Sequence, residues 1–192
     1  AAVRYLRANA EKLHIEADSI GVVGGSAGAH LAGLMASGSN NVRLLGDGGN
    51  PKKSSSIQAA VVMAGPLEML TGSVADRSRS GNGFSNSNSW LRGTVDEKPA
   101  LYRDADAFVQ IDRNTAPILF MTGEFDNPAR NQRSRDRLAE LGIDTDILIY
   151  KDAKHGCWNR LPWLDFQPKL RSLASQDFGA DPPRKRRSQG HR

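Results

Sequence analysis

A serine in the middle of a glycine-rich run is the first feature of this sequence that could do chemistry. The run GGSAG, residues 24–28, matches the pattern G-x-S-x-G, in which a serine stands on a sharp turn between a strand and a helix. Small residues on both sides would keep the strand and the helix from colliding, and the helix start would offer backbone N–H groups to a developing oxyanion. The pattern predicts Ser26 as a nucleophile; the alternative is a plain hydroxyl in a turn.

A serine hydroxyl is a poor nucleophile unless an oriented base takes its proton, and the sequence has four histidines. His14 ends a helical pattern, His30 lies on the helix after the serine, and His191 falls in a basic terminal segment. His155 instead follows the apolar run TDILIY directly, and loops beyond strand ends are where open α/β sheets place their chemistry. We therefore predict His155 as the base, with an ordinary surface histidine as the alternative.

The third group should be a carboxylate that follows the preceding strand. The segment PILFMTGEFDNPA offers Glu124 and Asp126. Asp126 is better placed in the turn, and Glu124 is a neighbour or a substitute. The order along the chain is then Ser26, Asp126, His155, with each residue after its own strand, and this is the order found in α/β-hydrolases.

The single cysteine, Cys157, excludes a disulfide framework within the chain. It adjoins His155, so a Cys–His nucleophile pair is an alternative to the serine. Near neighbours on one short loop rarely reach the geometry that a nucleophile and its base require. We therefore expect Cys157 to be a small packing residue.

These residues need a scaffold of strands alternating with helices, and the hydrophobic pattern predicts one. Apolar runs indicate four strands, at residues 20–25, 57–64, 117–122 and 145–150. Helical periodicity or helix-forming composition marks residues 3–13, 27–38 and 128–143. Nearly continuous apolar strands are typical of parallel sheets that are covered on both faces. We expect an α/β fold with three layers, α/β/α, around a mostly parallel sheet with right-handed crossovers.

Two polar stretches interrupt this alternation. Residues 38–56 are expected to form a loop. Residues 71–98 form a long excursion rich in Ser, Gly and Asn, and a loop of this length is usually a lid, a binding element or disordered. The pair Trp90-Leu91 indicates that part of this insertion docks on the domain.

Length and charge exclude several function classes. The 192 residues correspond to one domain, or most of one. Residues 181–192 hold five Arg or Lys and one Asp, so of the formal charge of +5 only +1 remains for the first 180 residues. No base-reading module accompanies the basic segment, and we expect no nucleic-acid partner. No apolar run approaches the roughly 18 residues of a membrane span, and the first residues read as an amphipathic helix rather than a signal peptide.

Three quoted stretches carry a resemblance to a known family. GGSAGAHLA, LFMTGEFDNPA and KHGCWN with the following LPW resemble the esterase/lipase branch of the α/β-hydrolases. They are similar in particular to bacterial acetyl-xylan-esterase-like carbohydrate esterases, and also to lipase/esterases of the hormone-sensitive type. The resemblance runs from about residue 2 to Trp163. It implies hydrolysis of carboxylic esters through an acyl-serine, with no cofactor and no metal.

The resemblance also implies a role for each site residue. Ser26 would attack the ester, His155 would act as base and then as acid, and Asp126 would hold the imidazole. The backbone N–H of Ala27 would supply half of the oxyanion hole. The expected substrate is a short-acyl or acetyl ester of a carbohydrate or small molecule. A serine peptidase or amidase on the same fold, or a chain that binds without catalysis, are the alternatives.

The sequence departs from the family pattern at both ends. A His-Gly-Gly type loop, which would supply the second oxyanion N–H, does not precede the elbow, and only 25 residues stand before Ser26. We therefore expect residues 1–166 to be a partial hydrolase domain, the C-terminal portion of the fold, whose first strand has an open apolar edge. Residues 167–192 are expected to be a disordered basic tail. A truncated reading frame, shifted near Phe166, would account for both departures. The sequence makes no prediction of the cellular compartment.

Overall fold

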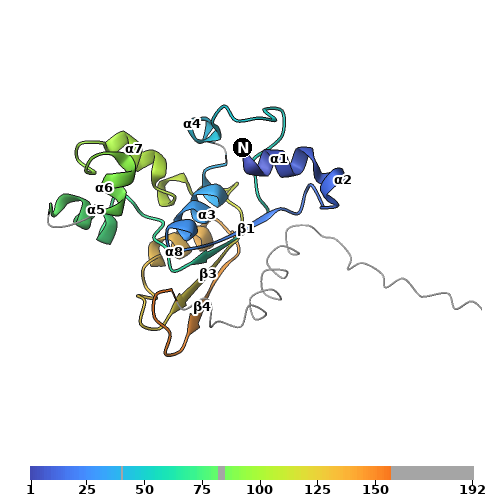
Figure 1. Ribbon diagram of the computed structural model, residues 1–192. Helices are drawn as coiled ribbons and strands as arrows, with labels where there is room; N and C mark the ends of the chain where they lie inside the picture. Colours follow the sequence, from blue (N-terminus) through green and yellow to red (C-terminus); the bar gives the residue numbers. More distant parts are fainter. Residues whose placement is uncertain (40, 82–84, 157–192) are drawn as a thin grey trace, which may run out of the picture.

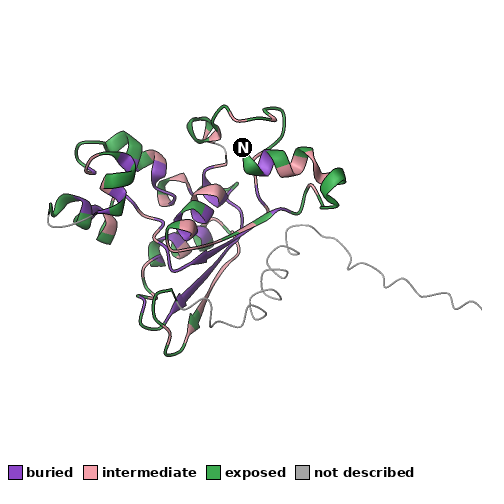
Figure 2. Cartoon of the chain, viewed as in Figure 1, coloured by how far each residue is buried: buried purple, intermediate pink, exposed green. Residues whose placement is uncertain are grey.

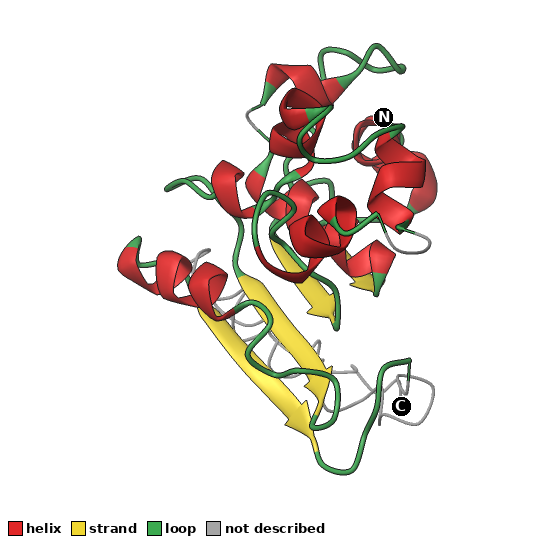
Figure 3. Ribbon diagram, turned by 90° about the vertical axis from the view of Figure 1, so that its left-hand side faces the viewer, coloured by secondary structure: helices red, strands yellow, loops and turns green. Residues whose placement is uncertain are grey.

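Four apolar segments form one parallel sheet in the computed structural model, which describes residues 1–39, 41–81 and 85–156 (Figure 1). The strands lie in the order β1-β2-β3-β4. Their bounds are β1 Gly21–Gly25, β2 Ala59–Met63, β3 Ile118–Gly123 and β4 Thr145–Tyr150. Each lies within or next to a predicted strand. Figure 3 shows the arrows pointing the same way, so the carboxyl ends of all four strands meet at one edge.

The two central strands carry the core. Every residue of β2 and β3 is buried, which explains why both read as continuous apolar runs (Figure 2). Side chains such as Ala60, Val62 and Ile118 face the main cluster, while Val61 and Leu119 form a smaller one on the opposite face. Within the described sheet β1 is an edge strand, paired with β2. Val23 on this strand is 47% exposed.

Helices flank the sheet as the alternating pattern predicts. Helix α3 (Ala27–Ser37) packs on β1 and β2, and α8 (Gln132–Glu140) packs beside β4. The predicted N-terminal helix is divided into α1 (Ala2–Ala8) and α2 (Ala10–Leu13). The break falls at Asn9, whose side-chain amide donates to the carbonyl of Tyr5 at 2.8 Å and so competes with the helical hydrogen bonds. The prediction of an α/β fold around a parallel sheet is confirmed.

The polar stretch at residues 38–56 is held by a buried arginine. It contains one short helix, α4 (Val42–Leu45), and is otherwise a loop, as expected. Arg4, only 4% exposed, donates to the carbonyl of Leu45 at 2.8 Å and to that of Gly49 at 3.2 Å. The loop is thereby tied to the N-terminal helix.

The insertion at residues 71–98 differs from the expected loop, because it contains two helices. Helices α5 (Gly72–Arg79) and α6 (Asn86–Leu91) stand with α7 (Pro99–Ala105) to one side of the sheet (Figure 1). They have a small apolar cluster of their own, and Leu91 belongs to it. Of the pair Trp90-Leu91, it is Trp90 that contacts the sheet domain, through the ring of His30 on α3. Trp90 is 53% exposed.

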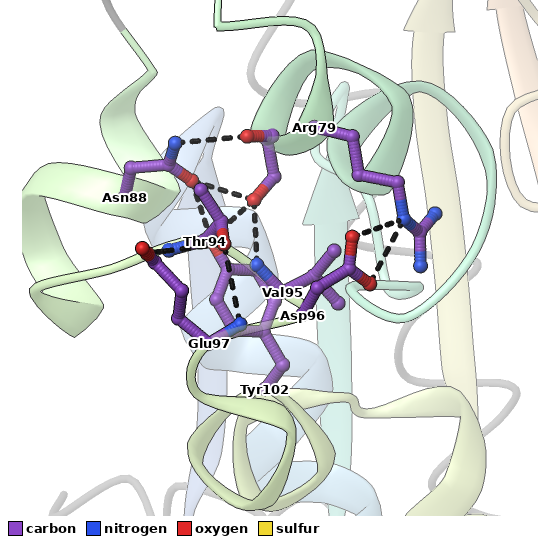
Figure 4. A network of polar contacts seen from close by, with 8 residues as sticks. Arg79, Asn88, Thr94, Val95, Asp96, Glu97 and Tyr102 are labelled. Carbon is purple, nitrogen blue, oxygen red and sulfur yellow. Dashed lines mark hydrogen bonds and ion pairs between the residues drawn. The ribbon is translucent and has the colours of Figure 1, made fainter.

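Polar contacts join these helices in addition to the apolar cluster (Figure 4). Ser78 and Tyr102, both fully buried, donate hydroxyl hydrogen bonds to the side-chain oxygen of Asn88 at 2.6 and 2.7 Å. The backbone N–H of Val95 donates to the hydroxyl of Ser78 at 2.8 Å. A hydrophobic periodicity cannot reveal such a network, because its members are polar residues brought together from three helices and a loop.

A single buried carboxylate ties together the two ends of the segment that carries α5, α6 and α7. Asp106 is 1% exposed, and its oxygens accept from the backbone N–H groups of Met69 and Leu70 at 2.8 Å and of Val109 at 3.1 Å. It therefore joins the chain before α5 to the chain after α7.

Asp106→Asn is expected to lower the free energy of unfolding by about 2–3 kcal/mol, because the new amide group would face N–H donors in a buried site. Urea unfolding followed by circular dichroism measures this. Asp104→Asn is the control, since Asp104, which is partly buried, forms an ion pair with the exposed Arg43 at 2.7 Å, and its loss should cost less than about 1 kcal/mol. Equal losses for the two variants would contradict the anchoring role of Asp106.

None of the helices in the described ranges is both long and apolar enough to cross a membrane. The predicted basic tail at residues 167–192, and Cys157, lie outside the described residues.

Candidate active site

Ser26 occupies the turn between β1 and α3, as the sequence pattern predicts. Its backbone has φ 54° and ψ −117°, a conformation that costs energy for a non-glycine residue and is found mainly at functional sites. Backbone hydrogen bonds hold it there: Ser26 N–H donates to the Met63 carbonyl at 2.9 Å, and the Ser26 carbonyl accepts from the N–H groups of Ala29 at 3.0 Å and His30 at 3.2 Å. The strand pair and the helix together therefore impose the strained turn.

Close backbone contacts explain the small residues around the turn. A Cβ on Gly24 would overlap the carbonyl oxygen of Gly28 and would lie 2.8 Å from Ala29 N. A Cβ on Gly65 would overlap the carbonyl oxygen of Ser26 and lie 2.5 Å from the Ala29 Cβ. At Gly28 no described atom lies within 4 Å of a Cβ. The predicted need for a residue without a side chain therefore holds at Gly24. It holds equally at Gly65, a position that the sequence pattern did not indicate. At Gly28 there is room for a side chain.

Gly24→Ala is expected to lower the free energy of unfolding by about 2–3 kcal/mol, since a methyl group there collides with backbone that cannot move aside. Gly28→Ala is the matched control, because alanine fits that open helical position and is expected to raise stability by up to about 1 kcal/mol. Thermal and urea unfolding of both variants provide the measurement. Equal losses of stability for the two variants would contradict the conclusion that Gly24 is tightly packed and Gly28 is not.

The predicted base lies in hydrogen-bonding contact with both the serine and the predicted carboxylate. His155 Nε2 is 3.0 Å from Ser26 Oγ, and His155 Nδ1 is 2.7 Å from Asp126 Oδ2. A carboxylate accepts only, so a neutral imidazole donates its Nδ1–H to Asp126 and leaves Nε2 to accept the serine proton. The structure therefore brings together three side chains that are separated by up to 129 positions in the chain.

Two interlocked loops hold the carboxylate and the histidine in place. The loop after β3 and the loop after β4 are joined by Phe125 N–H, which donates to the Ala153 carbonyl at 3.0 Å. Glu124, the other predicted carboxylate, accepts from the backbone N–H of Asp152 at 3.0 Å. Glu124 thus shapes the loop that carries His155, while Asp126 contacts the imidazole itself.

An arginine that the sequence pattern did not indicate completes the surroundings of Asp126. The aspartate is 8% exposed, and its Oδ1 accepts from Arg130 Nη2 at 2.8 Å. Arg130 also donates to the carbonyl of Ala64, at the end of β2. The two carboxylate oxygens are therefore assigned separately, one to Arg130 and one to His155. The four-residue spacing of an acid and a base was the available signal in the sequence.

His30 does not meet the serine, although it lies four residues beyond it. Its ring is 6% exposed, and Nε2 donates to the Ala105 carbonyl at 2.6 Å. Burial lowers the pKa of His30 below its ordinary value, so the ring stays neutral. It contacts the indole of Trp90 edge-on, with 5.7 Å between ring centroids. His30 therefore supports the helical insertion.

A cavity of about 400 Å³ opens beside Ser26 and His155. Its other side is formed by the helical insertion, through Val74, Arg77 and Trp90. This volume is within the range of small-molecule sites. Ala27 also lines it, and its N–H is in the first helical position, where the helical hydrogen-bond pattern provides no acceptor.

Solved structures with the same fold are esterases. A truncated carbohydrate esterase from gut microbiota aligns with a TM-score of 0.69 at 21% identity, over 91% of this chain and 66% of that one. An acetyl ester-xyloside bifunctional hydrolase from Caldicellulosiruptor lactoaceticus aligns with a TM-score of 0.64 at 21% identity, over 93% and 63%. Native esterase 2 from Thermogutta terrifontis gives 0.63 at 20% identity, over 96% and 64%.

The chain spans less than two thirds of the length of these esterases. No curated protein sequence matches it. The fold is that of the α/β-hydrolases, as the resemblance implied. The match to a family model extends over residues 1–141, which include Ser26 and Asp126 and end before His155. On this match, over most of its length, the chain belongs to the BD-FAE family.

Proposed function

We propose that this protein hydrolyses carboxylic esters through an acyl-serine intermediate. The observation that carries the proposal is the hydrogen-bonded series Asp126–His155–Ser26, which lies at the wall of a small-molecule cavity. A nucleophile, a base and a group that orients the base are the three parts this chemistry requires. The fold shared with esterases supports the same proposal.

Each residue then has one role in the reaction. His155 Nε2 takes the proton of Ser26 as Oγ bonds to the ester carbonyl carbon, and Asp126 stabilises the imidazolium that forms. The N–H of Ala27 donates to the oxyanion. When the carbon–oxygen bond to the alcohol breaks, His155 returns the proton to the leaving alcohol. Water then attacks the acyl-serine with the same base, which releases the acid and restores Ser26.

We propose short-acyl esters, acetyl esters in particular, of a carbohydrate or small molecule as the substrates. Two features support this choice: the modest size of the cavity, and the acetyl ester-xyloside hydrolase and carbohydrate esterase among the similar structures. Amide hydrolysis on the same site is the competing activity, since the three residues alone do not separate esters from amides.

Turnover of 4-nitrophenyl acetate and of an aminoacyl 4-nitroanilide by the 192-residue chain tests the proposal. We expect release of nitrophenol and little or no release of nitroaniline. A fluorophosphonate probe gives a second readout, because it labels a serine only where a base has activated it. Preferred cleavage of the anilide would favour a peptidase or amidase. A folded sample that neither turns over the ester nor takes the label would favour a chain that binds without catalysis.

A further inference from the structure

The charge of the cavity is positive and rests on one side chain. Its described lining contains Arg77 and Arg130 and two histidines, but no aspartate or glutamate. Arg130 is balanced by Asp126, and His30 is neutral. Arg77 is different, because no carboxylate of the described residues lies within ion-pair distance of its guanidinium. An unbalanced guanidinium at a substrate cavity is a binding group for a carboxylate or a similar anion.

A neighbouring arginine on the same helix shows that the position of Arg77 is distinctive. Arg77 and Arg79 both lie in the last turn of α5, where a cation favours the helix dipole. Arg79 is paired with Asp96 at 3.1 Å and is absent from the described cavity lining. Both arginines interact favourably with the helix dipole. That interaction therefore does not explain why Arg77, and not Arg79, lines the cavity.

An aromatic surface lies in the same cavity. Trp90 lines it with a side chain that is 53% exposed, an unusual position for a tryptophan. The buried His30 ring makes a T-shaped contact with the indole, at an interplanar angle of 77°, which restrains it. A restrained, exposed indole offers a flat face to the apolar side of a ring. Ser73 and Asn86 line the cavity nearby and can exchange hydrogen bonds with ring hydroxyls.

We propose that Arg77 and Trp90 form a subsite for a sugar ring that carries a carboxylate, so that the preferred substrate is an acyl ester of an acidic saccharide. The inference rests on the proposed ester hydrolysis and names its substrate class. The indole packs against the ring, the guanidinium binds the carboxylate, and the ester carbonyl carbon is directed to Ser26. Because the carboxylate takes no part in the reaction, it is bound equally in the ground state and the transition state, and the preference falls on KM.

The test compares two substrates that differ in one group, monoacetylated methyl glucuronoside and monoacetylated methyl glucoside, by acetate release. At low salt we expect kcat/KM to be about five- to tenfold higher for the glucuronoside, with the difference arising from KM. Added salt is expected to reduce this preference, because it screens the charge of Arg77. Arg77→Gln is expected to bring the ratio of the two kcat/KM values to within about twofold. Arg79→Gln, the matched control, is expected to leave the ratio unchanged.

Binding to the Ser26→Ala chain separates this inference from the proposed function. The two monoacetates are titrated against that variant, with and without Arg77→Gln, and the Kd values are compared. Tighter binding of the glucuronoside that depends on Arg77, with no turnover by the unmodified chain, would support the subsite and overturn the esterase. Turnover of both compounds with equal kcat/KM and equal Kd would overturn the subsite and leave the esterase intact. The subsite would also be overturned if Arg79→Gln lowered the ratio of the two kcat/KM values as much as Arg77→Gln does, or if neither compound bound.

Discussion

Ser26→Ala is expected to reduce kcat for 4-nitrophenyl acetate by about 10⁴–10⁶-fold, because the variant lacks the oxygen that we propose forms the acyl intermediate. The fold should persist. The contacts that hold the turn, to Met63 and Ala29, are made by backbone atoms that alanine retains. Initial rates of nitrophenol release, measured beside circular dichroism and thermal unfolding, separate a loss of chemistry from a loss of structure.

Ser80→Ala is a suitable control for the serine substitution. Ser80 is exposed at the end of α5, where its hydroxyl donates to the Arg77 carbonyl at 3.0 Å, and it does not line the described cavity. We expect its rate to stay within about twofold of the unmodified chain, as for most surface substitutions. Unchanged turnover by Ser26→Ala would remove Ser26 from the mechanism, whatever the geometry of the turn.

Asp126→Asn is expected to lower kcat by about 10³–10⁴-fold, since it presents the histidine with the wrong hydrogen-bonding partner. Arg130 can only donate, so the asparagine oxygen would turn towards Arg130 Nη2 and its amide group towards His155 Nδ1. Nδ1 must then accept, which places the imidazole proton on Nε2. A protonated Nε2 cannot take the proton of Ser26. The arginine thus makes the isosteric substitution more damaging than simple loss of charge.

Glu124→Gln tests the same prediction from the other side. Glu124 accepts one backbone N–H, from Asp152, and a glutamine carbonyl can accept it as well. We expect less than about a fivefold change in kcat, the scale of one retained hydrogen bond with altered charge. The pH dependence of kcat/KM for each variant would show whether the base is affected. A large loss with Glu124→Gln and a small one with Asp126→Asn would reverse the two assignments.

Local sequence was sufficient for the strands and for the turn at Ser26. Each strand is a short apolar run. In β2 and β3, which are buried on both faces, apolar residues occupy nearly every position. The turn could also be predicted from a local pattern, because a strand, small residues and a helix start lie within ten positions. In the structure the Met63 carbonyl on β2 helps to hold it. Asp126 and His155 each follow a strand, and these strands pair in parallel. Because the carboxyl ends of parallel strands lie at one edge of the sheet, the two residues could be expected to lie close together.

Tertiary structure decided what depends on contacts between distant residues. The insertion at residues 71–98 lacks an apolar stripe, and its helices depend on Ser78, Asn88 and Tyr102 meeting in space. The separate assignment of the Asp126 oxygens to Arg130 and His155 is likewise a matter of geometry.

The same distinction applies to the groups around the cavity. Gly65 is small because another segment crosses it, and Arg77 joins the cavity because α5 folds over the serine. Sequence alone therefore determined the alternating α/β scaffold and the types and order of the three side chains that meet at the candidate site. Only the folded chain decided what surrounds and orients them, because hydrogen bonds and close contacts between distant segments have no periodic signature in the sequence.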